Sequence, residues 1–245
     1  RTVEAADEDA ARARIDAERW GDGLPAVPPT PARVARMLSG TALDPAEVVA
    51  RVAPDYAPAT VEKIAVNAVL AGCDPDHLPV VVAGVRAMCA DAFNLHGLAA
   101  TTHWACPLFV VNGPIARELG FNGGVGAFGN GTKANAVVGR ALRLVMMNVG
   151  GARPGGISRT TQGHPGRYTY CIAENEGESP WEPLHVERGF SRESSAITAV
   201  AAEAPHGLVD QASRTAEELA LSLGWSMAGM WSHQHFPVAA QTVLA

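Results

Sequence analysis

The strongest constraint on the fold is a helix-start signal that recurs in the first third of the chain. A residue with a capping side chain stands directly before proline at Thr30-Pro31, Asp44-Pro45 and Asp74-Pro75. The capping side chain accepts a backbone N–H, and proline suits the first helical position because its missing N–H would have no partner there. The pattern predicts a short helix beginning at each of these points.

Apolar residues recur at helical spacing between and after these starts. Residues 60–70 carry them every three or four positions, and residues 79–89 are nearly all apolar, which predicts a buried helix. Residues 3–19 combine strong helix formers with acidic residues ahead of arginines, an order that the helix dipole favours. The N-terminal part is therefore expected to be a helical scaffold that begins with a solvated helix.

Strand signals are few and short. Residues 108–111 (LFVV) and 196–201 (AITAVA) predict strands by composition, and residues 168–173 (YTYCIA) are rich in aromatic and β-branched side chains between glycines and prolines. We therefore expect an α/β (or α+β) fold, in which a mainly helical N-terminal part packs on a small mixed sheet built from short strands.

Two further helices are indicated in the second half of the chain. Apolar spacing predicts a helix over residues 133–149, capped by Asn130 or Thr132. Thr215 and Glu218 form the pattern of a capping box that opens a helix to about Met230.

The 245 residues are long enough for one large domain or two small ones. Hydrophobic residues make up 47% and charged residues 18%, which is the composition of a compact soluble protein. We expect residues 1–29 to form an N-terminal helical arm with a Pro/Gly-rich segment, and residues 30–245 a single catalytic-type domain. The final residues, PVAAQTVLA, favour a domain that continues past the chain end.

Charge and hydropathy exclude two classes of partner. The net charge is -6, and no Lys/Arg cluster offers the basic stripe that a phosphate backbone requires, so we expect no nucleic-acid partner. No apolar run reaches the ~18 residues that span a bilayer, and no signal-peptide pattern stands near the start, so no membrane partner is expected.

Cysteine usage indicates the compartment. The chain has four cysteines, Cys73, Cys89, Cys106 and Cys171. Their spacing forms no CxxC pair and no dense disulfide framework. The sequence therefore predicts reduced thiols in a cytoplasmic protein.

A glycine-rich loop before the helix at residue 133 predicts an anion site. Residues 128–135 (FGNGTKAN) would bring unpaired backbone N–H groups, the positive end of the helix dipole and Lys133 to one point. A carboxylate or a small phosphate is the expected ligand. The loop does not match the Walker A motif. A tight connection whose glycines only allow close packing is the alternative.

His103 and Cys106 stand three residues apart just before a predicted strand. An imidazole that close could lower the pKa of the thiol and produce a nucleophilic thiolate. A small core cysteine and a structural histidine are the alternative.

Residues 160–190 hold the densest set of chemically active groups. His164 precedes the strand predicted at residues 168–173, which contains Cys171, and Glu174 and Glu176 follow it at i, i+2. Two carboxyls that share a face would raise the pKa of one of them, as a general acid requires. Solvated loop charges are the alternative for these glutamates, and a packed turn is the alternative for Trp181, His185 and Arg188.

Two groupings of residues could hold a metal ion. His103, Cys106, His164 and Cys171 would make a tetrahedral set of two nitrogens and two sulfurs, and His233 and His235 have strand spacing on one face. Neither grouping has a diagnostic spacing, so the sequence predicts no metal site.

Several segments taken together resemble one family over nearly the full chain. They include WGDGLPAVPPT, FNLHGLAATTH, VNGPIARELG, GRALRLVMMNVGGARPG, TQGHPGRYTYCIAENE and SPWEPLHVERGF. The chain resembles the large region of bacterial proteins of the UGSC family, which contain selenocysteine or cysteine. The resemblance implies a domain that works with a small Cys/Sec-bearing partner, fused or separate. This chain has no CGSC or similar motif, so that chemistry would have to come from another chain.

These signals lead us to expect an enzyme, or the large subunit of one, that acts on a small carboxylated metabolite by lyase or hydratase-type acid/base chemistry. The alternatives are a thiol or selenol oxidoreductase completed by a partner chain and a non-catalytic scaffold subunit. The sequence indicates no particular cofactor, and an oligomer is expected. The expected catalytic residues are His103, Cys106, His164, Cys171 and Glu174, and the expected substrate-binding residues are Asn112, Asn130, Thr132, Lys133, Asn135 and Glu176.

Overall fold

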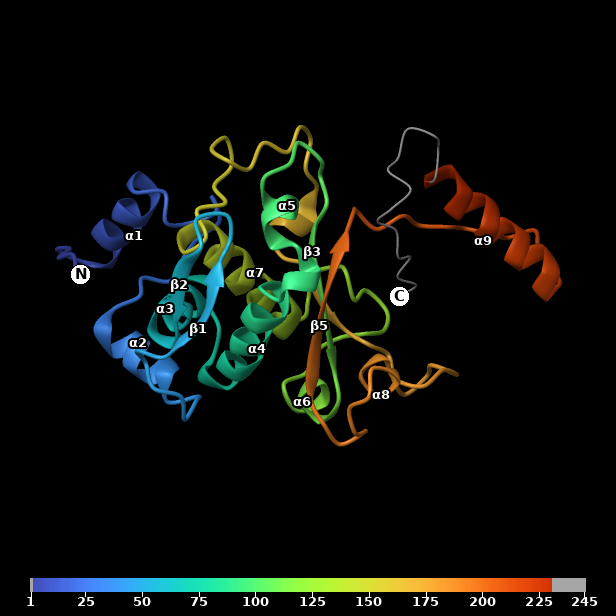
Figure 1. Ribbon diagram of the computed structural model, residues 1–245, viewed down its shortest axis with the longest axis horizontal. Coiled ribbons are helices and arrows are strands. Elements are labelled where there is room, and N and C mark those ends of the chain that lie inside the picture. The colour runs from blue at the N-terminus through green and yellow to red at the C-terminus, as the bar shows by residue number, and fades with distance from the viewer. Residues whose placement is uncertain (1, 231–245) are drawn as a thin grey trace. The chain divides into compact units, whose positions relative to one another are not determined.

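The computed structural model describes residues 2–230 and divides the chain into two compact units, residues 1–203 and 204–245 (Figure 1). This boundary lies elsewhere than the expected one at residues 29/30. His233, His235 and the final segment PVAAQTVLA lie outside the described residues.

The first unit contains most of the helices. They are α1 (Glu8–Ala17), α2 (Pro31–Leu38), α3 (Val61–Ala71), α4 (Leu78–Met88), α5 (Leu95–Ala99), α6 (Pro114–Glu118), α7 (Lys133–Asn148) and α8 (Leu184–Glu187). Three single turns of 3-10 helix lie between them, at η1 (Pro75–His77), η2 (Asp91–Phe93) and η3 (Pro165–Arg167). The helical N-terminal part is confirmed.

The predicted capping residues act as helix starts at most of their positions. Thr30 Oγ1 accepts the N–H of Arg33 at 3.3 Å at the start of α2, where Pro31 takes the first helical position. Thr60, which was not predicted as a cap, does the same at the start of α3. At Asp74 the chain enters the turn η1, in which the His77 ring accepts the Asp74 N–H at 2.9 Å, and η1 continues directly into α4.

The prediction of a helix at Asp44-Pro45 is wrong. The Asp44 side chain accepts the N–H of Ala46 at 2.7 Å, which closes a turn. The chain then enters β1 (Val48–Val52), which pairs antiparallel with β2 (Ala57–Thr60). This hairpin escaped prediction because β2 reads APAT, with a proline and two alanines in place of the branched and aromatic residues that favour strands.

The other sheet has three strands in the order β4-β3-β5. β3 (Cys106–Asn112) lies in the centre, pairs parallel with β4 (Cys171–Ala173) and antiparallel with β5 (Ala196–Ala202). The small mixed sheet of short strands is therefore confirmed. β4 begins later than predicted, because Tyr168 still belongs to the turn that follows η3 and donates its N–H to Pro165 O.

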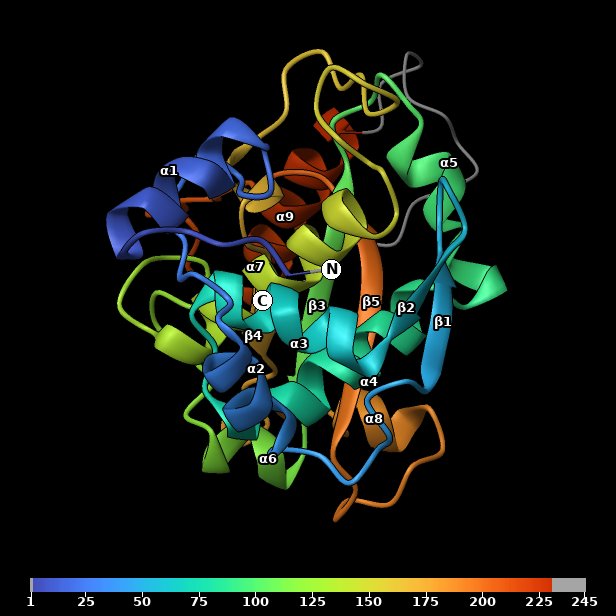
Figure 2. The same cartoon turned by 90° about the vertical axis from the view of Figure 1, so that its left-hand side faces the viewer.

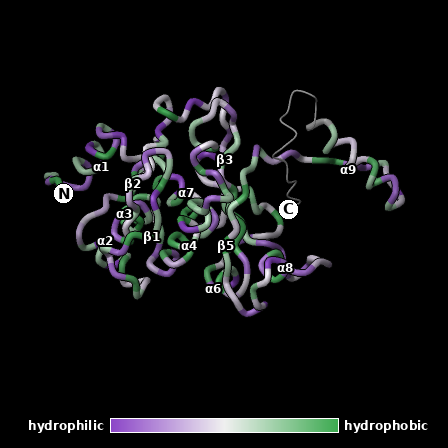
Figure 3. The backbone as a smooth tube through the Cα atoms, viewed as in Figure 1, coloured by the Kyte–Doolittle hydropathy of each residue, from purple (hydrophilic) through white to green (hydrophobic). Residues whose placement is uncertain are grey.

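The two faces of this sheet are covered differently. Phe109 and Val111 face the main core, which includes residues of α3, α4 and α7. Figures 1 and 2 show these three helices grouped beside the sheet, and Figure 3 shows the hydrophobic residues along β5. The other face carries a smaller apolar cluster, made of Cys106, Leu108, Val110, Tyr170 and Ile172. Each β3 residue is buried, so polar groups can gather only at the strand ends.

The expected N-terminal arm belongs to the first unit. α1 is shorter than residues 3–19 and begins after Asp7, whose side chain accepts the N–H of Ala10 at 2.7 Å. Asp22 pairs through both carboxylate oxygens with Arg140 of α7, at 2.8 Å each. Asn148 donates to Trp20 O at 2.8 Å. These contacts tie the arm to α7.

The second unit contains α9 (Ala216–Met230). Thr215 Oγ1 accepts the N–H of Glu218 at 3.2 Å, and Glu218 Oε2 accepts the N–H of Thr215 at 3.1 Å. The predicted capping box is therefore confirmed.

Within residues 2–230, no single helix combines the length and the apolar character needed to cross a membrane. Pro75–Met88 and Asp91–Ala99 meet that criterion only as a pair, across a bend of 69°.

Candidate functional site

Six of the eleven predicted site residues gather at opposite ends of β3 instead of around one pocket. Cys106 is the first residue of the strand and Asn112 the last. Six residue steps at about 3.3 Å each place the two ends about 20 Å apart. We call the group at Cys106 the amino-end cluster, comprising His103, Cys106, Arg143, His164, Arg167, Tyr170 and Glu203. We call Asn112, Glu174 and Glu176 the carboxyl-end cluster.

At the amino-end cluster Cys106 contacts His164, and the expected pair of His103 with Cys106 is not formed. Cys106 Sγ lies 3.5 Å from His164 Nε2. His164 caps the turn η3, and its Nδ1 accepts the N–H of Gly166 at 3.2 Å. A neutral imidazole whose Nδ1 accepts carries its proton on Nε2. This assignment points an N–H donor at the sulfur.

The resting pair is a thiol and a neutral imidazole. Burial raises the pKa of Cys106 to about 11, although the charges of Arg143 and Arg167 act in the opposite direction. Burial lowers the pKa of His164, and Arg167 and Arg143 lower it further. The expectation of a thiolate activated by a neighbouring imidazole is therefore wrong for the resting protein, because desolvation disfavours both charged forms.

His103 is engaged by a carboxylate that the sequence did not single out. His103 Nε2 lies 3.0 Å from Glu203 Oε1, while its Nδ1 accepts the N–H of Ala105 at 3.2 Å. Tyr170 donates its hydroxyl to Glu203 O at 2.8 Å. Glu203 follows Ala202, which pairs with Cys106 in the antiparallel register. Only the strand order could have revealed this neighbour.

Two arginines of the amino-end cluster were also missed. Arg143 lies on the buried side of α7 and is 4% exposed; its Nε donates to Arg167 O at 3.0 Å. Arg167 donates to Ala105 O at 3.1 Å and to Ser158 Oγ at 2.9 Å. In the described part of the chain, neither arginine forms an ion pair with a carboxylate. The signal in the sequence was an arginine on the apolar side of a helix.

The carboxyl-end cluster joins two glutamates through one amide. Asn112 Nδ2 donates to Glu174 Oε2 at 2.5 Å and to Glu176 Oε1 at 3.0 Å. Glu176 also accepts the N–H of Gly113 before α6, and Glu174 accepts that of Leu184 in α8. The i, i+2 spacing therefore does bring the two carboxylates together. Their hydrogen bonds hold the starts of two helices against the strand ends.

Some buried atoms near the carboxyl ends lack a partner. Asn112 is 0% exposed, and its Oδ1 has no hydrogen-bond partner among the described residues. His185 in α8 is 1% exposed, and neither of its ring nitrogens has a partner within residues 2–230. Trp181, by contrast, is 73% exposed.

The polar groups of the glycine-rich loop are used within the fold. Lys133 Nζ pairs with Asp74 at 2.6 Å, which neutralises the expected anion-binding charge. Asn135 accepts the N–H of Asn122 at 2.9 Å and donates to Asn122 O and Ala127 O, so its amide holds the loop. Thr132 precedes α7 without a capping hydrogen bond from its side chain, and Asn130 is exposed. This geometry fits the alternative of a tight connection.

Cys171 lies on the opposite face of the sheet from Cys106. It belongs to the main core beside α7, where burial raises its pKa. The set of His103, Cys106, His164 and Cys171 is therefore not assembled around one point. Among residues 2–230, no group of three His, Cys, Asp or Glu side chains is arranged to hold a metal ion.

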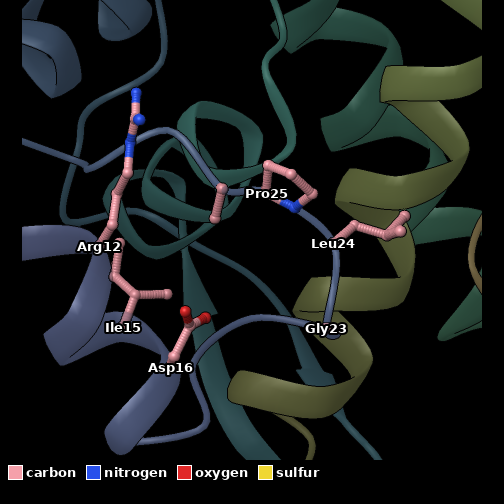
Figure 4. A pocket seen from close by; sticks show the side chains of 7 residues that line it. Arg12, Ile15, Asp16, Gly23, Leu24 and Pro25 are labelled. Atoms are coloured by element: carbon pink, nitrogen blue, oxygen red, sulfur yellow. The ribbon is translucent and has the colours of Figure 1, made fainter. Parts of the chain in front are cut away.

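Two surface hollows lie away from both clusters. One of about 360 Å³ lies between α1 and residues 23–26 and is lined by Arg12, Asp16 and apolar side chains (Figure 4). Another, of about 90 Å³, includes Tyr56 and His96. None of the predicted site residues lines either hollow. We locate the candidate site at the amino-end cluster, because interacting titratable side chains indicate chemistry more directly than a hollow does.

Comparison with known proteins found no matching family model, no matching curated protein and no matching solved structure.

Proposed function

We propose that this chain is an enzyme, or the large subunit of one, that acts on a small carboxylated metabolite by acid/base chemistry of the lyase or hydratase type. The observation that carries the proposal is the contact of Cys106 Sγ with His164 Nε2 at 3.5 Å. Around it stand two arginines without carboxylate partners in the described part of the chain. Such a surrounding favours an anionic substrate.

Cys106 and His164 would divide the proton transfers. A thiol with a pKa of about 11 gives a strongly basic thiolate once its proton passes to hydroxide from the solvent. A base of that kind suits removal of a proton from the carbon next to a carboxylate. The Nε2–H of His164 can hydrogen-bond this thiolate and stabilise its charge. His103, held by Glu203, would be the second proton carrier.

Hydrogen–deuterium exchange tests this function without knowledge of the full reaction. The protein is incubated in D2O with a panel of small hydroxy acids and unsaturated acids, and NMR follows the loss of the C–H signal next to the carboxylate. Wild type should exchange at least one acid. His164→Gln and Cys106→Ser should slow that exchange by about 100-fold or more, the range expected for a lost acid or base.

Two control variants distinguish the amino-end cluster from the rest of the protein. Cys89→Ser removes a thiol outside the amino-end cluster and should leave the exchange rate unchanged. Glu174→Gln should also leave it unchanged if the protein stays folded. If exchange persists in His164→Gln but is lost in folded Glu174→Gln, the reaction takes place at the carboxyl-end cluster. That result would refute the location of the site at the amino-end cluster.

Thiol or selenol redox chemistry with a partner chain is the second candidate. Cys106 is the one cysteine of the four in the smaller apolar cluster, so this chain supplies no second thiol beside it. A disulfide or selenosulfide at Cys106 would therefore need a sulfur or selenium from another chain. Native mass spectrometry of protein from its own host would detect such a partner, and a non-catalytic scaffold would retain the partner in Cys106→Ser.

A further inference from the structure

Arg143 is a cation in an apolar position. It lies within α7, between residues that pack into the main core, such as Leu142 and Leu144. Its side chain is almost completely removed from solvent, with 4% of the residue exposed. Leaving a charge in such surroundings without a partner costs several kcal/mol of folding free energy.

The hydrogen bonds of Arg143 do not compensate its charge. Its Nε donates to the neutral carbonyl of Arg167, and its Nη1 faces the sulfur of Met146 at 3.3 Å, which is a weak acceptor. No protein acceptor for Nη2 is found among the described residues. Part of the guanidinium fork is therefore available to an anion.

Arg167 adds a second cation beside the first. Its guanidinium donates to Ala105 O and Ser158 Oγ, both of them neutral, and its charge lowers the pKa of Arg143 together with burial. Neighbouring guanidinium groups repel each other unless an anion lies between or beside them. The pair therefore has a high affinity for negative charge.

The anionic groups of the cluster do not fill this role. Cys106 is close enough for both arginines to act on its pKa, but burial keeps it a thiol at neutral pH. Glu203 Oε1 is engaged by His103. The described residues of the first unit therefore provide no counter-ion for the two arginines.

We propose that Arg143 and Arg167 form a carboxylate-binding subsite next to Cys106. Arg143 is the more deeply buried of the two cations, whereas Arg167 and His164 are half-buried. A guanidinium fork binds the two oxygens of a carboxylate in parallel, which holds the rest of a small acid in one orientation. The identity of this carboxylate as that of a substrate rests on the proposed function; the binding itself does not.

Alkylation of Cys106 reports on this subsite directly. Iodoacetate carries a carboxylate and iodoacetamide is its neutral analogue; in both reactions the thiolate sulfur forms a bond to carbon and iodide leaves. The rates at Cys106 and at Cys89 are measured in the same intact protein by mass spectrometry of the peptides. The ratio of the two reagent rates cancels any change in the thiolate fraction.

The expected result is a charge-dependent preference at one cysteine. The iodoacetate-to-iodoacetamide ratio at Cys106 should be about tenfold higher in wild type than in Arg143→Met, the effect of one nearby charge. Arg143→Lys should keep most of the preference. The ratio at Cys89 should be the same in all three proteins. Equal ratios at Cys106 in wild type and Arg143→Met would overturn the proposal.

A second measurement needs no variant. Sodium acetate should slow the reaction of Cys106 with iodoacetamide in wild type, relative to sodium chloride at equal ionic strength, and should not slow the reaction of Cys89. Protection by phosphate alone would refute a carboxylate site. Neither alkylation test requires turnover, so an intact rate ratio with no deuterium exchange would refute the proposed function and leave the subsite standing.

Discussion

The glutamates at the carboxyl end of β3 and the arginines at its amino end differ in the partners of their charged groups. At the carboxyl end, Glu174 and Glu176 accept hydrogen bonds from Asn112 and from backbone N–H groups. At the amino end, Arg143 and Arg167 donate only to neutral acceptors among the described residues. The glutamates at the carboxyl end hold the starts of α6 and α8 in place. The arginines at the amino end have no carboxylate partner among the described residues.

This difference explains why we locate the site at the amino end. Ligands of parallel sheets commonly bind at the carboxyl ends of the strands. Here only β3 and β4 are parallel, and the antiparallel β5 runs toward the Cys106 end. Glu203, which follows β5 directly, therefore lies beside His103 at the amino end. An antiparallel edge strand can therefore contribute site residues at the amino end of the central strand, opposite to the usual carboxyl end.

The largest expected effect comes from adding a charge at the carboxyl end. Asn112→Asp replaces the shared amide donor with a buried third carboxylate that repels Glu174 and Glu176. We expect it to lower the free energy of unfolding by about 4 kcal/mol, as measured by urea denaturation. Asn130→Asp, at an exposed position, is the control and should change it by less than about 0.5 kcal/mol. Equal small losses in both variants would mean that the cluster is open to water.

Removing a charge at the amino end should raise the free energy of unfolding instead of lowering it. Burial lowers the pKa of Arg143 from 12.5 to about 10, which corresponds to a cost of about 3 kcal/mol at neutral pH. Arg143→Met removes this cost and loses the hydrogen bond to Arg167 O, worth about 1 kcal/mol. We expect the variant to be more stable by about 2 kcal/mol in urea denaturation.

Arg140→Met is the matched control on the same helix. Arg140 pairs with Asp22 through two hydrogen bonds of 2.8 Å, so its removal leaves a carboxylate unpaired and should destabilise the protein. If Arg143→Met destabilises the protein as much as Arg140→Met does, the charge of Arg143 is compensated within the fold. The contrast between the two ends of β3 would then be lost.

The pH dependence of the alkylation rate of Cys106 should show that burial raises the pKa of this thiol. With a pKa of about 11, its alkylation by iodoacetamide should rise about tenfold per pH unit between about pH 8 and pH 10. The same cysteine in protein unfolded by guanidinium chloride should reach its plateau near pH 9.5, because an unperturbed thiol titrates near pH 8.5. A plateau near pH 8 in the folded protein would indicate an activated thiolate.

The sequence predicts the scaffold better than the site because local signals specify it. Thr30 and Thr215 mark helix starts through side chains that act within one turn. The β1–β2 hairpin was missed because its second strand owes its conformation to pairing and not to its own residues. Asp44 was misread because a capping aspartate closes turns as well as helices.

The candidate site could be predicted only in part because its contacts join distant segments. His164 and Cys106 were both singled out, but their pairing depends on how two loops fold over the start of β3. Glu203 reaches His103 through the register of β5, and Arg143 reaches the cluster from α7. The pairing of Glu174 with Glu176 was predictable because both leave the same strand within three residues.

The smallest expected effect is the pH dependence that His164 gives to stability. Its pKa is lowered in the folded protein, by burial first and then by Arg167 and Arg143. As the pH falls through about 6.5, the unfolded chain therefore takes up this proton before the folded chain does, and wild type loses stability. His164→Gln lacks this proton uptake, so any stability advantage of wild type over the variant should shrink between about pH 7.5 and pH 5. His206→Gln, at an exposed position, is the control for the loss of one imidazole. If the advantage grows toward low pH instead, the folded state stabilises an imidazolium at position 164, which requires an anion that offsets both arginines and would remove the positive character assigned to the amino end.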